Sequence, residues 1–557
     1  MEDSIEDHKP STSSNVGKIN DGCFLVLKLS EDDPLSEKKM KLLRDKGFGP
    51  SDRVYLHDIS APDVNAKLDA LLERARIIHL NDVELYFGPM NVDTKGELFG
   101  PCNDLKGAAQ VDICSEENKG YIDSLKSLRD EIVKRIHNFG EKNTLKTKMV
   151  KEASDSENHL VQWAENSGLK SKLQIAYVEG AGRGALAAED LGVGDIALEI
   201  PVSVIISEDL VYESDMAQIL EKIDGISTET KLLLWSMRER HNIDSNYKLY
   251  FDSLPEQFNT GLSFGLEALM ALDETLVSDE LFQAKEHLRS EYDELFPALS
   301  ISYPDSFSPE YYTWEQYLWA CELWYSNSMK IVFPDGKLKT CLIPVAGFLN
   351  HSVCPHILHY GRADAETNTL KFPLSRPCKK GEQCYLSYGN LSSAHLLTFY
   401  GFLPQEPNPF DIIPLDIEAA PDCSSEEGYL DTATHMVRGT WFSANQDMFH
   451  YGLPLPLLEH LRSATNPGLK TMTLLQENLE NEVTVLDNIH AIFGNMLDKL
   501  GDSNMDDRKN EKWDVKLAIK YKDLQRSILS SILTACYTGR VMVLDALEKC
   551  LAEDVRG

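Results

Sequence analysis

The stretch "LIPVAGFLNHS", residues 342–352, and the stretch "GEQCYLSYGNLSSAHLLTFYGF", residues 381–402, decide the fold. The first leads from an apolar segment directly into Asn350 and His351. The second alternates along its first residues as a strand does, ends that pattern at Tyr388, and continues into a short helical pattern. A tyrosine in such a place is usually a packing residue whose hydroxyl finds a partner. Each stretch taken alone is therefore compatible with an ordinary packed loop.

The polar residues around the first stretch suggest two other kinds of site. The tripeptide at 350–352 matches a glycosylation sequon, but no secretory signal accompanies it, so we exclude glycosylation. The cluster of His351, Cys354, His356 and His359 raises the question of a metal site. Its spacing is not a familiar zinc pattern, and ligands so close in one loop converge poorly on a tetrahedral ion. We therefore expect no metal.

A glycine run, "EGAGRGALAAEDL" at residues 179–191, invites a nucleotide-binding interpretation. A dinucleotide fingerprint lies between a strand and a helix, whereas this run leads into a second strand-like segment. Residues 184–207 predict two strands joined at "LGVGD" in a hairpin-like arrangement. The run on its own is therefore interpreted as a glycine turn without a ligand.

The composition excludes several classes of partner. The chain has 557 residues and a formal net charge of -34, from 55 Lys and Arg against 89 Asp and Glu. Such a charge repels phosphate backbones and anionic lipids, so we expect no nucleic acid and no membrane as partner. Eleven scattered cysteines without a CxxC pair favour reduced thiols over a disulfide framework. The acidic start matches neither a signal nor a transit peptide, which predicts a cytoplasmic or nuclear location, or both.

The length predicts two to four domains. Residues 1–20 read as a disordered tail, and residues 21–145 as an N-terminal α/β extension of unknown role. A polar linker follows, and Asp155 or Ser156 is expected to cap the next helix. Residues 208–333 are mostly helical by periodicity. Beyond residue 450 helices dominate, with apolar residues at three- and four-residue steps.

The glycine run with "LEIP", the "LIPVAGFLNHS" stretch and the "GEQCYLSYGN…YGF" stretch together resemble the SET-domain protein methyltransferases, specifically the Rubisco large-subunit lysine methyltransferase branch. The resemblance implies an α+β fold with a knot-like crossing. A SET domain over residues 155–405 would contain a helical insert at about 208–333. An all-α substrate-binding domain would occupy residues 410–557. The resemblance covers about 400 residues, from 155 to 557.

The resemblance also implies a binding site for S-adenosyl-L-methionine. Gly182, Arg183 and Gly184 would lie along this cofactor, mostly through backbone groups. Asn350 and His351 would lie in the crossing that holds its adenosyl part.

Three further positions follow from the same resemblance. Tyr388 would be the catalytic tyrosine at the methyl-transfer channel, and Tyr400 would line the substrate tunnel. The branch commonly carries an arginine for the cofactor carboxylate on the helix before the Asn-His-Ser motif. Counting from Trp319, this cofactor-binding position is Asn327 here, and Lys330 could be a displaced partner. A neutral amide lacks the charge-assisted, bidentate pairing that arginine gives a carboxylate.

The function implied is that of an S-adenosylmethionine-dependent protein-lysine N-methyltransferase. The C-terminal helical domain would bind the protein substrate, and the chain would act as a monomer. No C-terminal cysteine triad resembles the zinc-binding post-SET segment of histone methyltransferases, which favours a non-histone substrate. The alternatives are a non-catalytic SET-fold binding module and a histidine-directed protein methyltransferase.

Overall fold

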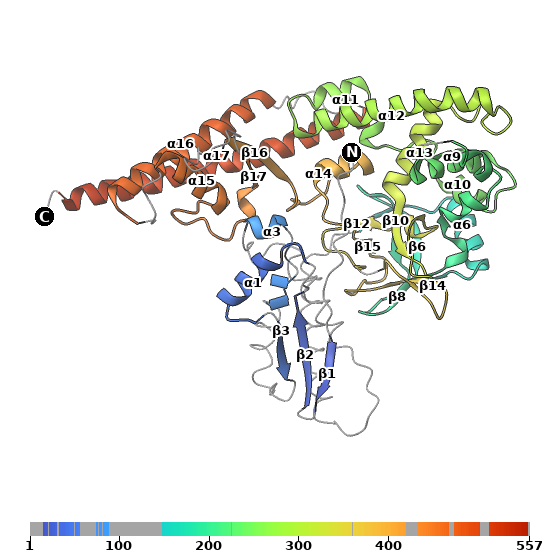
Figure 1. Ribbon diagram of the computed structural model, residues 1–557, viewed down its shortest axis with the longest axis horizontal. Coiled ribbons are helices and arrows are strands. Elements are labelled where there is room, and N and C mark those ends of the chain that lie inside the picture. Colours follow the sequence, from blue (N-terminus) through green and yellow to red (C-terminus); the bar gives the residue numbers. More distant parts are fainter. Residues whose placement is uncertain are drawn as a thin grey trace.

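The computed structural model describes most of the chain from residue 147 onward and parts of the N-terminal region. The described residues are 15–19, 22–29, 33–49, 51–55, 74, 75, 77, 78, 80, 82–87, 147–223, 226–358, 360–418, 432–466, 473–501 and 512–554. Figure 1 shows a small N-terminal sheet, a β-rich part wrapped by helices, and a long helical arm that carries the C-terminus.

The N-terminal part contains a three-stranded antiparallel sheet and short helices. Its elements are β1 (Asn15–Ile19), β2 (Gly22–Lys28), β3 (Ser51–Tyr55), α1 (Ser36–Asp45) and α3 (Asp82–Phe87). The expected disordered tail over residues 1–20 is therefore wrong for residues 15–19, which pair with β2. Tyr86 in α3 hydrogen bonds to His435 Nδ1 at 2.7 Å, which joins this part to the C-terminal region.

The β-rich part consists of small sheets built from strands that are distant in sequence. The first sheet has the strand order β4 (Met149–Glu152), β6 (Leu173–Val178), β7 (Gly182–Ala187), and the second has the order β13 (Ala363–Asp364), β14 (Thr369–Pro373), β8 (Ile196–Pro201), β5 (Lys170–Ser171). The third sheet has the order β10 (Ser328–Val332), β11 (Leu338–Leu342), β9 (Ile206–Ser207). The fourth pairs β12 (Asn350–His351) with β15 (Tyr385–Leu386). The predicted strands β7 and β8 are present, but they do not form the expected hairpin. β7 pairs with β6, and β8 pairs with β14 and β5.

The stretches at residues 342–352 and 381–402 lie side by side. β12 pairs with β15 in parallel, with Asn350 opposite Tyr385 and His351 opposite Leu386. Parallel neighbours need a long connection, and about 30 residues of chain separate these two strands. This pairing places the Asn-His pair beside the segment that leads to Tyr388.

Helices cover the sheets and form the insert. They are α6 (Asp155–Asn166), α7 (Asp209–Glu213), α8 (Ala217–Leu220), α9 (Thr228–His241), α10 (Lys248–Ser253), α11 (Leu266–Ala271), α12 (Leu276–Ser302) and α13 (Trp314–Asn327). Helix α6 begins with a capping box between Ser154 and Glu157, so the cap lies one residue before the predicted candidates. The insert and the sheets share one hydrophobic core, which includes Trp235, Tyr317 and Phe372.

The C-terminal region is not all-α as expected. An antiparallel pair, β16 (Ile412–Glu418) and β17 (Thr432–Arg438), precedes its helices α15 (Leu455–Thr465), α16 (Gln476–Leu500) and α17 (Trp513–Asp554). Alternating buried residues such as Ile413 and Leu415 turn one face of β16 toward the second hydrophobic core.

Helix α17 connects the two cores. Its first turns carry Val515, Ala518 and Tyr521 into the core of the β-rich part, and its later turns pack against α16 in the arm seen in Figure 1. By length and composition alone α17 could cross a membrane, a property that buried core helices share. Leu529 and Ile532 are buried against protein, whereas Tyr537 and Val541 are exposed.

Candidate active site

The glycine turn lies directly against the Asn350 side chain. Gly182 has φ +70°, a backbone conformation that favours glycine, and no described atom lies within 4 Å of the place where its Cβ would be. A Cβ on Gly184 would lie 2.3 Å from Gln383 Oε1 and 3.2 Å from Asn350 Nδ2. Asn350 Nδ2 donates to the Arg183 carbonyl and to Gln383 Oε1, both at 2.8 Å. The turn and the Asn-His segment thus form one hydrogen-bonded unit.

The Arg183 side chain anchors this unit to α10 and α6. It donates to the Ser253 carbonyl at 2.6 Å and to Glu157 Oε1 at 3.3 Å. Glu157 is buried and also accepts from the Tyr177 hydroxyl at 2.9 Å. Burial raises the pKa of Glu157, but hydrogen bonds and the Arg183 charge outweigh it and lower the pKa overall. The Arg183 carbonyl thus accepts from Asn350, while its guanidinium lies over the Phe348 ring at 5.3 Å from the centroid.

Tyr388 is held by the segment that contains the Asn-His pair. Its hydroxyl donates to the Leu349 carbonyl at 2.8 Å, and its backbone N–H donates to His351 Nδ1 at 3.0 Å. Because His351 Nδ1 accepts this bond, the neutral imidazole carries its proton on Nε2. Asn350 Oδ1 and His351 Nε2 make no hydrogen bond to the described residues, so an acceptor and a donor stay free at this place.

Tyr400 stacks on Tyr388. Their ring centroids lie 5.0 Å apart at 25°. Tyr400 ends a short helical segment made of α14 (Ser393–His395) and the π-helical turn η6 (Leu396–Tyr400). The next residue, Gly401, has φ +73°, and a Cβ there would lie 1.7 Å from the Asn259 carbonyl oxygen. Only glycine fits, and this constraint sets where the Tyr400 ring lies.

Burial controls the protonation of these side chains. It raises the pKa of the Tyr388 hydroxyl well beyond its usual range, with smaller contributions from Tyr400 and Tyr360. It also lowers the pKa of His351 to about 4. At neutral pH the site therefore holds a neutral phenol and a neutral imidazole, and neither group is a strong base or a cation.

Asn327 lies at the end of α13, against the segment that leads to Asn350. Its Oδ1 is 3.3 Å from the position of a Cβ on Gly347, and its Nδ2 donates to Ser326 Oγ at 2.7 Å. The structure thus places the predicted residues Gly182 to Gly184, Asn350, His351, Tyr388 and Tyr400 together, with Asn327 along the same segment. Their roles toward a ligand stay predictions.

Comparisons with known proteins agree with this geometry. No family model matches the chain. It is 26% identical over 255 residues to the chloroplastic fructose-bisphosphate aldolase-lysine N-methyltransferase of Arabidopsis thaliana, covering 44% of this chain and 52% of the relative. It is 25% identical over 329 residues to the Rubisco large-subunit N-methyltransferase of Pisum sativum, covering 56% and 64%. The chain thus matches about half to two thirds of the length of these relatives.

The fold points to the same group. The solved structure of Rubisco LSMT bound to AdoMet superposes with a TM-score of 0.50 at 19% identity, over 70% of this chain and 93% of that chain. The chain has the SET-domain fold of Rubisco LSMT and resembles the methyltransferases of that branch in sequence. Sequence and fold therefore support the family that the three motifs indicated.

The SET domain also brings together a trio that the motif spacing did not predict. Donor atoms of His356, Cys378 and Cys384 lie within 4.8 Å of one another, and all three residues are buried. His356 Nδ1 accepts from the Tyr385 N–H at 3.0 Å, so the neutral ring carries its proton on Nε2. Nε2 has no partner among the described residues and, once protonated, no lone pair for a metal. The tautomer thus argues against a metal site, and His359 lies outside the described residues.

Two supporting residues of the SET domain were missed by the sequence analysis. Gln383 links Asn350 to the Tyr385 hydroxyl, which accepts from Gln383 Nε2 at 2.6 Å. The signal was available, because Gln383 lies inside the "GEQC" turn. Glu157, which fixes Arg183, lies in a helix whose only sequence signal was a cap.

Proposed function

We propose that this SET-domain protein is an S-adenosylmethionine-dependent protein-lysine N-methyltransferase that acts on a non-histone protein. One observation carries the proposal. Tyr388 is partly buried beside Tyr400 and is fixed at both its hydroxyl and its backbone by the segment that contains Asn350 and His351. One curated relative is a lysine N-methyltransferase by name, another is an N-methyltransferase of the Rubisco large subunit, and the fold is that of Rubisco LSMT.

The residues around the glycine turn fit a polar, cationic cofactor. The space beside Gly182 leaves room for a ligand next to the backbone. Asn350 Oδ1 and His351 Nε2 supply a free acceptor and a free donor, as an adenosine needs. The faces of Tyr388 and Tyr400 attract a positive charge through their π-electrons. When bound, S-adenosylmethionine supplies an electrophilic methyl group on a sulfonium that leaves as a neutral thioether.

The chain would contribute alignment and deprotonation of the amine. A lysine is charged at neutral pH, with a pKa near about 10.4, and only its neutral form is a nucleophile. Insertion among Tyr388, Tyr400 and neighbouring aromatic rings removes water and disfavours the ammonium, which lowers the lysine pKa. The proton would then leave to solvent. Tyr388 would orient the nitrogen and, as a neutral phenol, would not act as the base.

The test uses Tyr388→Phe in the full chain. We expect the rate of labelled-methyl incorporation into proteins of a cell extract to fall by about 10²-fold or more, with S-adenosylmethionine affinity by calorimetry changed less than about threefold. Tyr537→Phe, a tyrosine 68% exposed on α17, is the matched control and should behave as the parent. Undiminished incorporation by Tyr388→Phe would show that the tyrosine assignment is wrong.

A second function is favoured by one residue. Asn327 stands where the branch commonly carries an arginine, and without a cation the carboxylate of the cofactor lacks its charged partner. The chain would then be a non-catalytic SET-fold binding module. Calorimetry separates the two functions: no binding of S-adenosylmethionine at millimolar concentration supports the binding module and contradicts the enzyme.

A further inference from the structure

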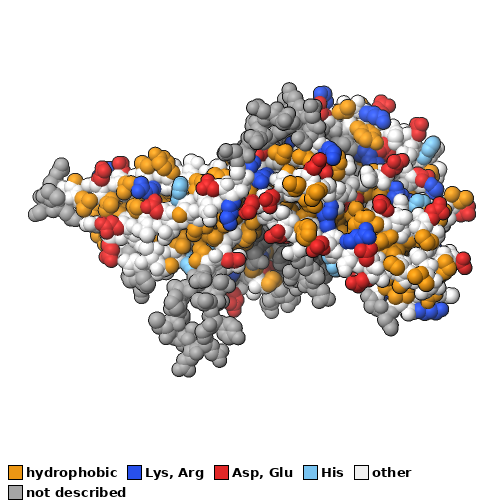
Figure 2. Space-filling model, turned by 90° about the horizontal axis from the view of Figure 1, so that it is seen from above, with side chains coloured by type: hydrophobic (Ala, Val, Ile, Leu, Met, Phe, Trp, Pro, Cys, Tyr) orange, Lys and Arg blue, Asp and Glu red, His pale blue; other side chains and the backbone are white. Residues whose placement is uncertain are grey.

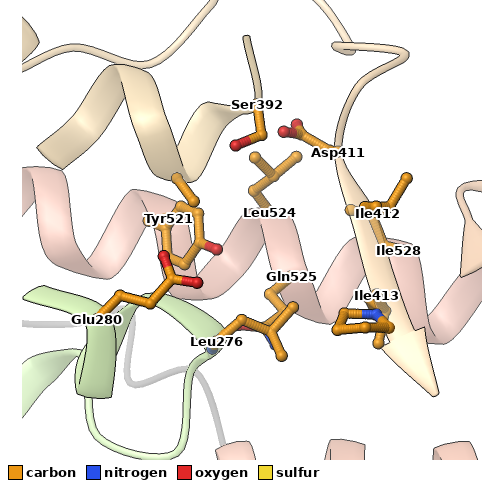
Figure 3. Close-up of a pocket in the computed structure, with 12 residues that line it drawn as sticks. Leu276, Glu280, Ser392, Asp411, Ile412, Ile413, Tyr521, Leu524, Gln525 and Ile528 are labelled. Carbon is orange, nitrogen blue, oxygen red and sulfur yellow. The ribbon is translucent and has the colours of Figure 1, made fainter. Parts of the chain in front are cut away.

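A cavity of about 320 Å³ lies where α17 meets β16, at the starts of α12 and α14 (Figure 3). This volume is at the lower end of the range for ligand pockets, which occur preferentially between domains. Apolar walls come from Ile412 and Ile413 of β16 and from Leu524 and Ile528 of α17. The cavity is separate from the Tyr388 site, and none of the candidate active-site residues lines it.

Two polar side chains that line this cavity are more than nine-tenths buried, and each has a polar atom without a partner among the described residues. Tyr521 is 6% exposed and lines the cavity, and its hydroxyl makes no hydrogen bond to the described residues. Figure 3 shows that hydroxyl close to the Glu280 carboxylate, which also lines the cavity. Gln525 is 7% exposed; its Oε1 accepts from the Leu276 N–H at 3.3 Å, whereas its amide nitrogen has no partner there. The Tyr521 hydroxyl and the Gln525 amide nitrogen are therefore available to a ligand in the cavity.

The charge of the cavity is negative and uncompensated. Asp411 is 8% exposed, accepts from the Ser393 N–H and hydroxyl at 2.6 and 2.7 Å, and has no basic partner among the described residues. Glu280, an exposed residue, also lines the cavity. None of the described residues that line the cavity is basic, although basic and acidic side chains are interspersed on the molecular face in Figure 2. Burial raises the pKa of Asp411 to about 6. A cation bound beside this carboxylate would lower its pKa again.

We propose that this cavity binds a basic side chain, lysine or arginine, of the protein substrate. The apolar walls match the methylene stem of such a side chain, and Glu280 and Asp411 match its charged end. The amide nitrogen of Gln525 is a donor, which suits a carbonyl of the peptide that carries the side chain. The proposal rests on the proposed function, because it assigns the cavity to recognition of the methylated protein.

The position of the cavity relative to Tyr400 suits this role. Asp411 holds Ser393 at the start of the helical segment that ends at Tyr400. The eight residues from Ser393 to Tyr400 span roughly 12 Å at 1.5 Å per residue, a length that about four residues of extended peptide cover. A basic residue near the target lysine could therefore occupy the cavity while the lysine lies at the Tyr388 site.

A binding experiment on the full chain tests the cavity without any methyl transfer. Nα-acetyl-arginine methylamide should bind with millimolar affinity by calorimetry, and the uncharged isostere Nα-acetyl-citrulline methylamide should bind at least about tenfold more weakly. Glu280→Gln and Tyr521→Phe should each weaken the arginine probe, the first by about tenfold. Glu286→Gln, an exposed carboxylate on the same helix, is the control and should leave binding unchanged.

Other results overturn the proposal. If both probes bind equally well, the cavity does not recognise a basic side chain. The same conclusion follows if the arginine probe binds unchanged to Glu280→Gln and Tyr521→Phe. Spermidine binding tighter than the arginine probe assigns the cavity to a free polyamine instead.

A methylation experiment separates this proposal from the proposed function. Glu280→Gln should lower labelled-methyl incorporation about tenfold at limiting extract protein and should approach the parent rate at saturating protein, a KM effect. An unchanged KM overturns the substrate role. If the unsubstituted protein transfers no methyl group but still binds the arginine probe in the cavity, the proposed function is contradicted and the cation-binding site remains supported.

Discussion

At the scale of single residues, His351 couples the candidate site to stability. Its ring is neutral in the folded chain because burial lowers its pKa to about 4 from an ordinary value of 6.5. The unfolded state therefore takes up a proton first as the pH falls. Stability that is fully present above about pH 6.5 is lost progressively as the pH falls through 4.

The prediction concerns the pH dependence of unfolding. Between pH 7.5 and pH 5 the free energy of unfolding should fall by about 2 kcal/mol through His351 alone. His351→Asn should lower the stability at pH 7.5, because the Tyr388 N–H loses its acceptor, but should show a pH dependence that is shallower by that amount. Chemical denaturation of both proteins at the two pH values measures the difference. Parallel pH profiles would mean that His351 is not buried as a neutral ring.

The contacts between the site residues could not be predicted from the sequence. Asn350, His351 and Tyr388 were named through a family resemblance, and their contacts depend on the pairing of β12 with β15, which no local pattern encodes. Gln383 and Glu157 were missed because their roles come from partners far away in the chain. Long-range hydrogen bonds leave no periodic signal.

At the scale of elements, local signals predicted the existence of helices and strands better than their partners. Alternation and glycine turns located β7 and β8, but the short connection between them suggested a hairpin that the sheets do not contain. Register and partner are set by burial against distant strands. The strand β16 was missed because its sequence follows a proline-rich break and precedes long helical patterns.

The end of η6 should tolerate no side chain at Gly401. Gly401 ends η6 with φ +73° against the Asn259 carbonyl, so Gly401→Ala must move one of the two chains. We expect a loss of roughly 3 kcal/mol or more in the free energy of unfolding and a displaced Tyr400 ring. Gly336→Ala is the control, since Gly336 has φ +82° but open space around its Cβ position, and only the left-handed conformation costs about 1–2 kcal/mol there.

Urea titration compares the two variants, and near-ultraviolet circular dichroism reports the aromatic stack. A Gly401→Ala protein no less stable than Gly336→Ala would mean that the Asn259 segment does not constrain Tyr400.

At the scale of the whole molecule, α17 ties the C-terminal region to the SET domain and shapes the cavity between them. Asp514 is 7% exposed, and its carboxylate accepts from the Gly265 N–H at 3.1 Å and from the Val515 N–H at 2.9 Å. It therefore links the start of α11 to the start of α17. An exposed ion pair at 3.0 Å joins Lys512, the residue before α17, to Glu267 of α11. Burial makes the first link strong, and solvent screens the second.

The last prediction compares these two links. Asp514→Ala removes charged hydrogen bonds at a buried position, so the free energy of unfolding should fall by about 2 kcal/mol. Hydrogen exchange should speed up in α11 and in the first turns of α17, because both lose the same anchor. Glu267→Gln removes only an exposed charge and should change stability by less than about 0.5 kcal/mol. Equal effects of the two substitutions, or faster exchange confined to α17, would show that Asp514 caps its own helix without holding the two regions together.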